Sequence, residues 1–110
     1  MAIERVAVIG AGTMGSGIAQ VCAQAGWRTN LYDAFPDGLE RGMERIAAFW
    51  EKGIARGKTT PEQRDEWSAN LTAVGDLAAA VKEADMVIEA VPEIPELKQR
   101  IFSELDELAP

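Results

Sequence analysis

Residues 6–19 read Val-Ala-Val-Ile-Gly-Ala-Gly-Thr-Met-Gly-Ser-Gly-Ile-Ala, a sequence that indicates one kind of strand-turn-helix unit. Its first residues are apolar and β-branched, which predicts a buried strand. The strand leads directly into a Gly-x-Gly-x-x-Gly turn, and apolar residues at helical spacing follow the turn. A strand, this turn and a helix in that order form the arrangement that holds the pyrophosphate of a dinucleotide.

Each glycine of the turn has its own expected role. Gly10 makes the tight turn after the strand, Gly12 leaves the backbone bare toward a pyrophosphate, and Gly15 lets the helix pack closely on the strand. Unpaired amides at the start of the helix, together with the helix dipole, then face the phosphate charge. We therefore expect a continuous cofactor-binding segment made of Gly10, Ala11, Gly12, Thr13, Met14 and Gly15.

A second strand, predicted over 28–32, ends in an acid, Asp33. The acid lies about twenty residues beyond the glycine turn, where this fold places a carboxylate that accepts hydrogen bonds from the adenosine ribose. A 2′-phosphate near Asp33 would meet a repulsion of about 4 kcal/mol per unit charge at a protein-like effective dielectric. The sequence therefore favours NAD over NADP. The alternative is that Asp33 only begins the loop before Pro36.

An almost wholly apolar run over 84–91 predicts another strand, buried on both faces. In an open α/β sheet, ligands bind at the carboxyl ends of the strands where the strand order reverses. This strand would neighbour the first strand across that point. We expect Ala90, Val91 and Glu93 to line the nicotinamide half of the site.

Between these strands the pattern predicts a long helix over 37–56, a short helix over 61–69, a strand over 70–74 and a short helix over 76–83. Two helices lie where a minimal unit needs one, so we interpret them as an insertion, with Trp50 and Trp67 packing them together. The expected fold is α/β: a Rossmann-like parallel sheet with helices on both faces and a two-helix insertion between strands 2 and 3. We expect residues 1–110 to form one NAD-binding domain with an incomplete sheet.

Composition narrows the function further. The 110 residues are 47% hydrophobic and carry a net charge of −7 without histidine. A chain with no basic stripe is a poor partner for nucleic acid, and its apolar runs are too short for a membrane span. The one cysteine, Cys22, lies on an apolar helix face, which favours a core role. With no secretion or transit pattern at the start, we expect a cytoplasmic protein.

These motifs together resemble the NAD-binding N-terminal domain of the 3-hydroxyacyl-CoA dehydrogenase family. The glycine turn over 10–19, Asp33 and the segment over 85–102, with Glu89, Glu93 and Lys98, carry the resemblance. The resemblance implies oxidation of a 3-hydroxyacyl thioester with hydride transfer to NAD. It also implies that Glu93 and Lys98 lie beside the cofactor. The family's catalytic histidine has no counterpart here, so we assign no catalytic residue and no metal ligand within this chain.

In the resembling enzymes the insertion supplies a serine and a lysine to coenzyme A, and Phe49 and Arg56 stand at those positions here. Arg56 can contact a phosphate, whereas Phe49 has no hydroxyl. Two alternatives therefore remain: a dehydrogenase of a free 3-hydroxy acid, similar to gulonate or carnitine dehydrogenases, or a stand-alone NAD-binding module. The apolar edge of the strand that contains Met86 predicts self-association into a homo-oligomer.

Overall fold

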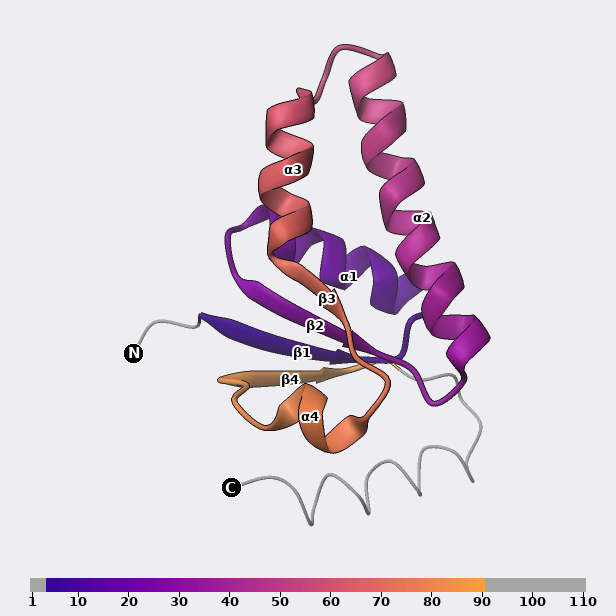
Figure 1. Cartoon of the computed structure of the whole chain (residues 1–110), viewed down its shortest axis with the longest axis vertical. Coiled ribbons are helices and arrows are strands. Elements are labelled where there is room, and N and C mark those ends of the chain that lie inside the picture. Colours follow the sequence, from indigo (N-terminus) through magenta and orange to yellow (C-terminus); the bar gives the residue numbers. More distant parts are fainter. Residues whose placement is uncertain (1–3, 91–110) are drawn as a thin grey trace.

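The computed structural model describes residues 4–90. Its elements, in chain order, are β1 (Arg5–Ile9), α1 (Thr13–Gln24), β2 (Arg28–Tyr32), α2 (Pro36–Ala55), α3 (Pro61–Ala69), β3 (Leu71–Ala73), α4 (Leu77–Val81) and β4 (Met86–Glu89). The strands form one sheet in the order β3-β2-β1-β4 (Figure 1). All three strand pairs are parallel, so the carboxyl ends of the strands lie at one edge.

The sheet order confirms the predicted α/β fold and puts the reversal of strand order at β1. The chain moves outward from β1 through β2 to β3, then crosses back to place β4 on the other side of β1. The register pairs Ile9 of β1 with Tyr32 of β2 and with Glu89 of β4. The ends of these three strands therefore meet at the point where a ligand is expected.

Helices cover both faces of the sheet, as predicted. On one face, α1 and α2 pack on alternate residues of β1 and β2, so that Val6, Val8 and Leu31 are fully buried with Ile46 and Trp50. On the other face the short helix α4 covers the remaining residues of β1, and the buried cluster there consists of Ala7, Ile9, Leu77, Ala80 and Val81. None of the described helices has the length and apolar character that crossing a membrane requires.

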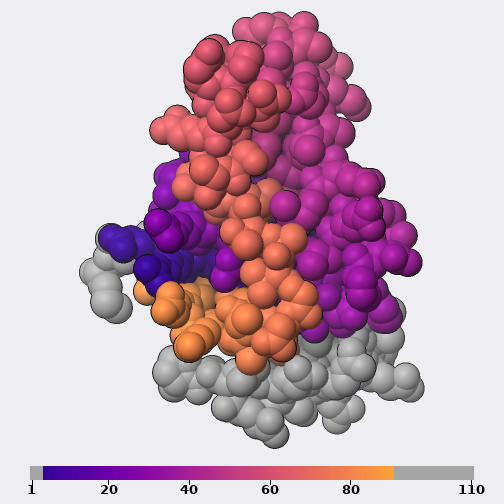
Figure 2. All heavy atoms as spheres, in the orientation of Figure 1, coloured from indigo at the N-terminus to yellow at the C-terminus, as the bar shows by residue number. Residues whose placement is uncertain are grey.

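The two-helix insertion is confirmed, and so is its aromatic contact. The rings of Trp50 on α2 and Trp67 on α3 have centroids 5.9 Å apart and planes tilted by 48°. Helix α3 starts as its sequence predicts, because the Thr60 hydroxyl accepts from the Gln63 amide while the Gln63 side chain accepts from the Thr60 amide. The far ends of α2 and α3 project beyond the sheet as one lobe (Figures 1 and 2).

The prediction that β4 is buried on both faces was wrong. Val87 is 42% exposed and the other residues of the strand are only half-buried. An apolar run indicates that a strand is hydrophobic, but it does not indicate whether the strand lies in the middle or at the edge of the sheet. Within residues 4–90, β4 pairs with β1 alone and lies at an edge, and α4 packs on β1 and β2 rather than on β4.

Asp85, just before β4, fastens that strand to the start of β1. Its Oδ2 atom accepts hydrogen bonds from the amides of Glu4, at 2.9 Å, and Arg5, at 3.0 Å. These two bonds to the charged form hold the pKa of the Asp85 carboxyl below its ordinary value, the Glu4 amide contributing most.

We expect Asp85→Asn to lower the melting temperature at neutral pH, because the amide is a weaker acceptor than the carboxylate. A group whose pKa is lowered by folding stabilises the native state above its unfolded pKa and loses that contribution as the pH falls through its folded pKa. The difference between the two proteins should therefore shrink on acidification. Thermal melts across an acid pH series measure it, with Glu44→Gln, an exposed acid on α2, as control. A difference independent of pH would contradict the assignment.

Candidate dinucleotide-binding site

Backbone hydrogen bonds gather the ends of three strands in front of α1. The Gly10 amide donates to the Tyr32 carbonyl at 2.7 Å, and the Ala90 amide donates to the Ile9 carbonyl at 2.7 Å. These bonds continue the sheet by one residue beyond the strands themselves. The turn between β1 and α1 is therefore fixed relative to both neighbouring strands.

The turn can form only because two of its residues lack a side chain. Gly10 has a φ of 110°, a conformation that residues with a Cβ rarely adopt. A Cβ atom on Gly15 would lie 1.7 Å from the Gly10 carbonyl oxygen, so α1 approaches the end of β1 as closely as the backbone allows. The same hypothetical atom would lie 3.5 Å from the Cβ of Ala90, which places Ala90 beside the turn.

Gly12 differs from both, because it faces open space. No heavy atom lies within 4 Å of a Cβ built on Gly12, although the residue forms the N-cap of α1. Among residues 4–90, the amides of Thr13, Met14 and Gly15 donate no hydrogen bond. An open space in front of free amides at a helix N-terminus matches what a pyrophosphate requires.

Asp33 lies at the end of β2 and is held in place by two backbone donors. Its Oδ2 atom accepts from the Ala11 amide at 2.8 Å, and its Oδ1 atom accepts from the Phe35 amide at 2.9 Å. The Ala11 amide is therefore used to hold the aspartate. Each carboxylate oxygen keeps a further lone pair, so Asp33 can still accept hydrogen bonds from a diol.

Helix α2 packs directly against the turn, a contact that the sequence reading missed. A Cβ on Gly42 would lie 2.6 Å from the Ala11 carbonyl oxygen, and a Cβ on Gly38 would lie 3.1 Å from Oδ1 of Asp33. The spacing of these two glycines, four residues apart on one helix face, is the signal that could have revealed the approach.

The contact of Arg45 with the start of α1 was also not predicted from the sequence. Its Nη1 atom donates to Oγ of Ser16 at 3.2 Å and, at a longer 3.4 Å, to the Ala11 carbonyl. Ser16 in turn donates to the Gly12 carbonyl at 2.7 Å. These bonds place one positive charge at the start of α1. No spacing rule links position 45 to the turn, so only the packing of α2 on α1 could show the contact.

The structure thus brings Ala90 and Asp33 together with the predicted segment of Gly10, Ala11, Gly12, Thr13, Met14 and Gly15. Three further predicted residues, Val91, Glu93 and Lys98, lie outside the described residues. The side chain of Met14 is 71% exposed, and the turn meets solvent on that side. The fold and these contacts define a dinucleotide-binding α/β domain.

Comparison with known proteins gives the family. Residues 5–110 match the model of the 3-hydroxyacyl-CoA dehydrogenase NAD binding domain. The chain belongs to this family, which confirms the resemblance drawn from the sequence, and the match agrees with NAD as the predicted cofactor.

Curated relatives and solved structures agree with this placement. The chain is 41% identical to a 3-hydroxyadipyl-CoA dehydrogenase of Escherichia coli over 98% of its own length and 22% of that protein's. It is also 41% identical to a 3-hydroxybutyryl-CoA dehydrogenase of Mycobacterium tuberculosis, over 96% of the chain and 36% of the relative. A crystal structure of 3-hydroxybutyryl-CoA dehydrogenase from Escherichia coli superposes with a TM-score of 0.90 at 40% identity, covering 100% of this chain and 23% of that one. The chain therefore spans about a quarter to a third of the length of these relatives.

We expect Gly12→Val to lower the affinity for NADH at least tenfold, because the branched side chain would fill the open space in front of the free amides. The fold should persist, since nothing lies within 4 Å of the new Cβ. Fluorescence titration measures the affinity and far-ultraviolet circular dichroism measures the fold. Gly17→Val, at an equally open position one turn along α1, is the control. Unchanged NADH binding by the Gly12 variant would mean that the phosphates bind elsewhere.

Proposed function

We propose that residues 1–110 form the NAD-binding domain of a dehydrogenase that oxidises a 3-hydroxyacyl-CoA to the 3-oxoacyl-CoA, with hydride transfer to NAD. One observation carries the proposal. Asp33 is fixed at 2.8 Å from the Ala11 amide, beside a turn whose Gly12 faces open space and whose following three amides have no acceptor among residues 4–90. The family and the names of the relatives support the choice of reaction.

The proposed roles follow from the geometry. The free amides of the first turn of α1, with Arg45 nearby, hold the pyrophosphate at Gly12. Asp33 accepts hydrogen bonds from the adenosine ribose and disfavours a 2′-phosphate. Ala90, directly after β4, lines the nicotinamide half of the site in this proposal, and so do Val91 and Glu93. Lys98 has the role that the family resemblance implies, beside the bound cofactor. The bound cofactor supplies the hydride chemistry, and this chain's residues bind and orient it.

This chain does not carry the acid–base step in our proposal. Oxidation of an alcohol needs a base within hydrogen-bonding reach of the hydroxyl and with a pKa near the working pH. Histidine is absent from the sequence, and unperturbed carboxylates and amines titrate far from neutrality. The proposed contribution of these residues is therefore confined to cofactor binding.

We expect the 110-residue chain to bind NADH and to show no turnover of 3-hydroxybutyryl-CoA. The missing base is the physical reason. Absorbance of NADH at saturating substrate measures turnover, and a full-length relative of the family serves as the positive control. Sustained NADH production by the pure chain would contradict this assignment and require a base within the 110 residues.

A second candidate substrate is a free 3-hydroxy acid, and Phe49 favours it. The ring of Phe49 is 59% exposed and lines a groove of about 380 Å³ between α1 and α2, with Lys52 beside it. A phenyl ring offers no hydrogen bond to a coenzyme A phosphate. Calorimetric titration of this chain with coenzyme A tests the choice between the two substrates. Coenzyme A binding that Lys52→Ala weakens would support a thioester substrate. No binding of coenzyme A would support a free acid.

Two further properties belong to the proposal. We expect a homo-oligomer, because β4 exposes Val87 at an edge of the described sheet, and light scattering would measure it. We expect a reducing compartment such as the cytoplasm, because the one cysteine of the sequence, Cys22, is a free thiol and cannot form a disulfide within the chain. Cell fractionation tests the location.

We expect the chain to bind NADH at least tenfold more tightly than NADPH, because the Asp33 carboxylate repels a 2′-phosphate. Asp33→Asn should reduce the preference for NADH over NADPH, since the asparagine side-chain oxygen can still accept from the Ala11 amide but the negative charge is gone. Calorimetric titration of both cofactors measures the ratio. Asp37→Asn, which removes the same charge from an exposed position in the first turn of α2, should leave the ratio unchanged. Equal affinities in the unmutated chain would refute the role of Asp33.

A further inference from the structure

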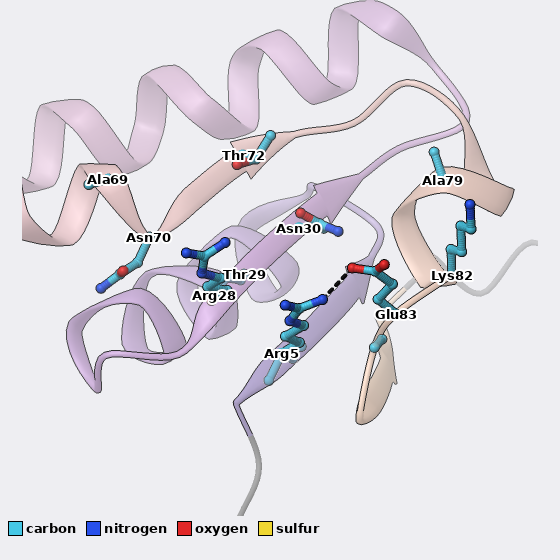
Figure 3. Close-up of a pocket in the computed structure, with 12 residues that line it drawn as sticks. Arg5, Arg28, Thr29, Asn30, Ala69, Asn70, Thr72, Ala79, Lys82 and Glu83 are labelled. Carbon is cyan, nitrogen blue, oxygen red and sulfur yellow. Dashed lines mark hydrogen bonds and ion pairs between the residues drawn. The ribbon is translucent and has the colours of Figure 1, made fainter.

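A second cavity, of about 430 Å³, lies at the opposite end of the sheet from the glycine turn. It is formed by the starts of β1 and β2, the residues around β3 and the C-terminal end of α4 (Figure 3). Its lining shares no residue with the predicted cofactor site. Whatever it binds is therefore separate from the dinucleotide.

Cations are concentrated around this cavity. Arg5 and Arg28 are register partners on adjacent parallel strands, so their backbones lie about 4.8 Å apart and their side chains leave the same face of the sheet. Arg5 forms an ion pair with Glu83. Within residues 4–90, Arg28 and Lys82 have no acidic partner. Three cations and one anion give the lining a formal charge of +2, in a chain whose net charge is −7.

Two other acids near the cavity accept hydrogen bonds from backbone amides. Asp85 lies next to Arg5, but its Oδ2 atom accepts from the backbone amides of Glu4 and Arg5. Asp76, which borders Lys82 on the other side of α4, accepts from the Ala79 amide to cap that helix. Neither carboxylate forms an ion pair with Arg28 or Lys82.

The floor of the cavity is polar and partly fixed. Asn30 and Thr72 are register partners on β2 and β3 and face the same side as Arg28. The Nδ2 atom of Asn30 donates to the Ala80 carbonyl at 3.1 Å, which holds the amide against α4. The exposed hydroxyl of Thr72 can donate to a ligand. The lining therefore combines charged donors with neutral polar groups.

We propose that this cavity is a binding site for a small dianion of the phosphate monoester class. Guanidinium groups suit this ligand, because their planar array of N–H donors matches phosphate oxygens in paired hydrogen bonds. The phosphate would lie between Arg28 and Lys82 with Thr72 as a neutral donor. The volume leaves room for an organic group beyond the phosphate.

The experiment is a titration of the chain with inorganic phosphate, followed by backbone amide NMR at constant ionic strength, with sodium chloride making up the difference. We expect saturable shifts at Arg5, at Arg28 and at Thr72. Phosphate bound at the start of α1 would instead shift Gly12 and Thr13, so the two ends of the sheet are read separately in one spectrum.

Arg28→Gln should weaken the phosphate-dependent shifts at Thr72 at least fivefold. Lys58→Gln, which removes the same charge from the exposed connection between α2 and α3, should not. Both variants should bind NADH with the affinity of the unmutated chain. A negative result for the phosphate cavity would therefore leave the proposed NAD site unaffected. Absence of saturable shifts around the cavity, or equal weakening by the two variants, would overturn the proposal.

Discussion

The hydrogen bond from the Ala11 amide to the Asp33 carboxylate, 2.8 Å long, is the contact on which the geometry of the cofactor site depends. It joins the turn after β1 to the residue after β2, two segments that the sheet brings together only at their ends. The Phe35 amide holds the other carboxylate oxygen. With both oxygens fixed, the acid that would meet the ribose and the turn that would meet the phosphates are placed relative to each other before any ligand arrives, which reduces the ordering cost of binding.

Close approach of backbone to backbone maintains this arrangement. Gly15 brings α1 against the end of β1, and Gly42 brings α2 against Ala11. Arg45 then reaches from α2 to Ser16 and the start of α1. In an acidic chain, most of the positive field for a pyrophosphate has to come from backbone amides, and a single arginine supplements them. We expect these amides and one cation to be enough to bind a pyrophosphate, because these donors, which have no acceptor among residues 4–90, all lie in the first turn of α1.

Local patterns allowed much of this to be predicted. The glycine spacing, the apolar strands and the Thr60 cap each depend on a few neighbouring residues, and the position of β4 beside β1 followed from the rules of open parallel sheets. The exposure of Val87 agrees with the apolar edge predicted for the strand that contains Met86, but not with the prediction of burial on both faces, because an apolar run does not show what lies beside a strand. The contact of Arg45 with the turn depends on the packing of two helices. The second cavity depends on the register that pairs Arg5 with Arg28, which composition does not reveal.

The two ends of the sheet therefore have different chemistry. At the carboxyl ends of the strands lie the backbone amides and the carboxylate that we propose for the dinucleotide, whereas at the amino ends Arg5, Arg28 and Lys82 line a polar cavity, and within residues 4–90 only Arg5 among them forms an ion pair. A crystal structure of this chain with NAD would show which residues hold the pyrophosphate and the ribose. We expect the pyrophosphate over Gly12 and both adenosine ribose hydroxyls within hydrogen-bonding distance of Asp33, with the Ala11 bond intact. NAD bound away from the turn, or an Asp33 rotated off Ala11 and out of reach of the ribose, would contradict the proposed roles of the turn and of Asp33.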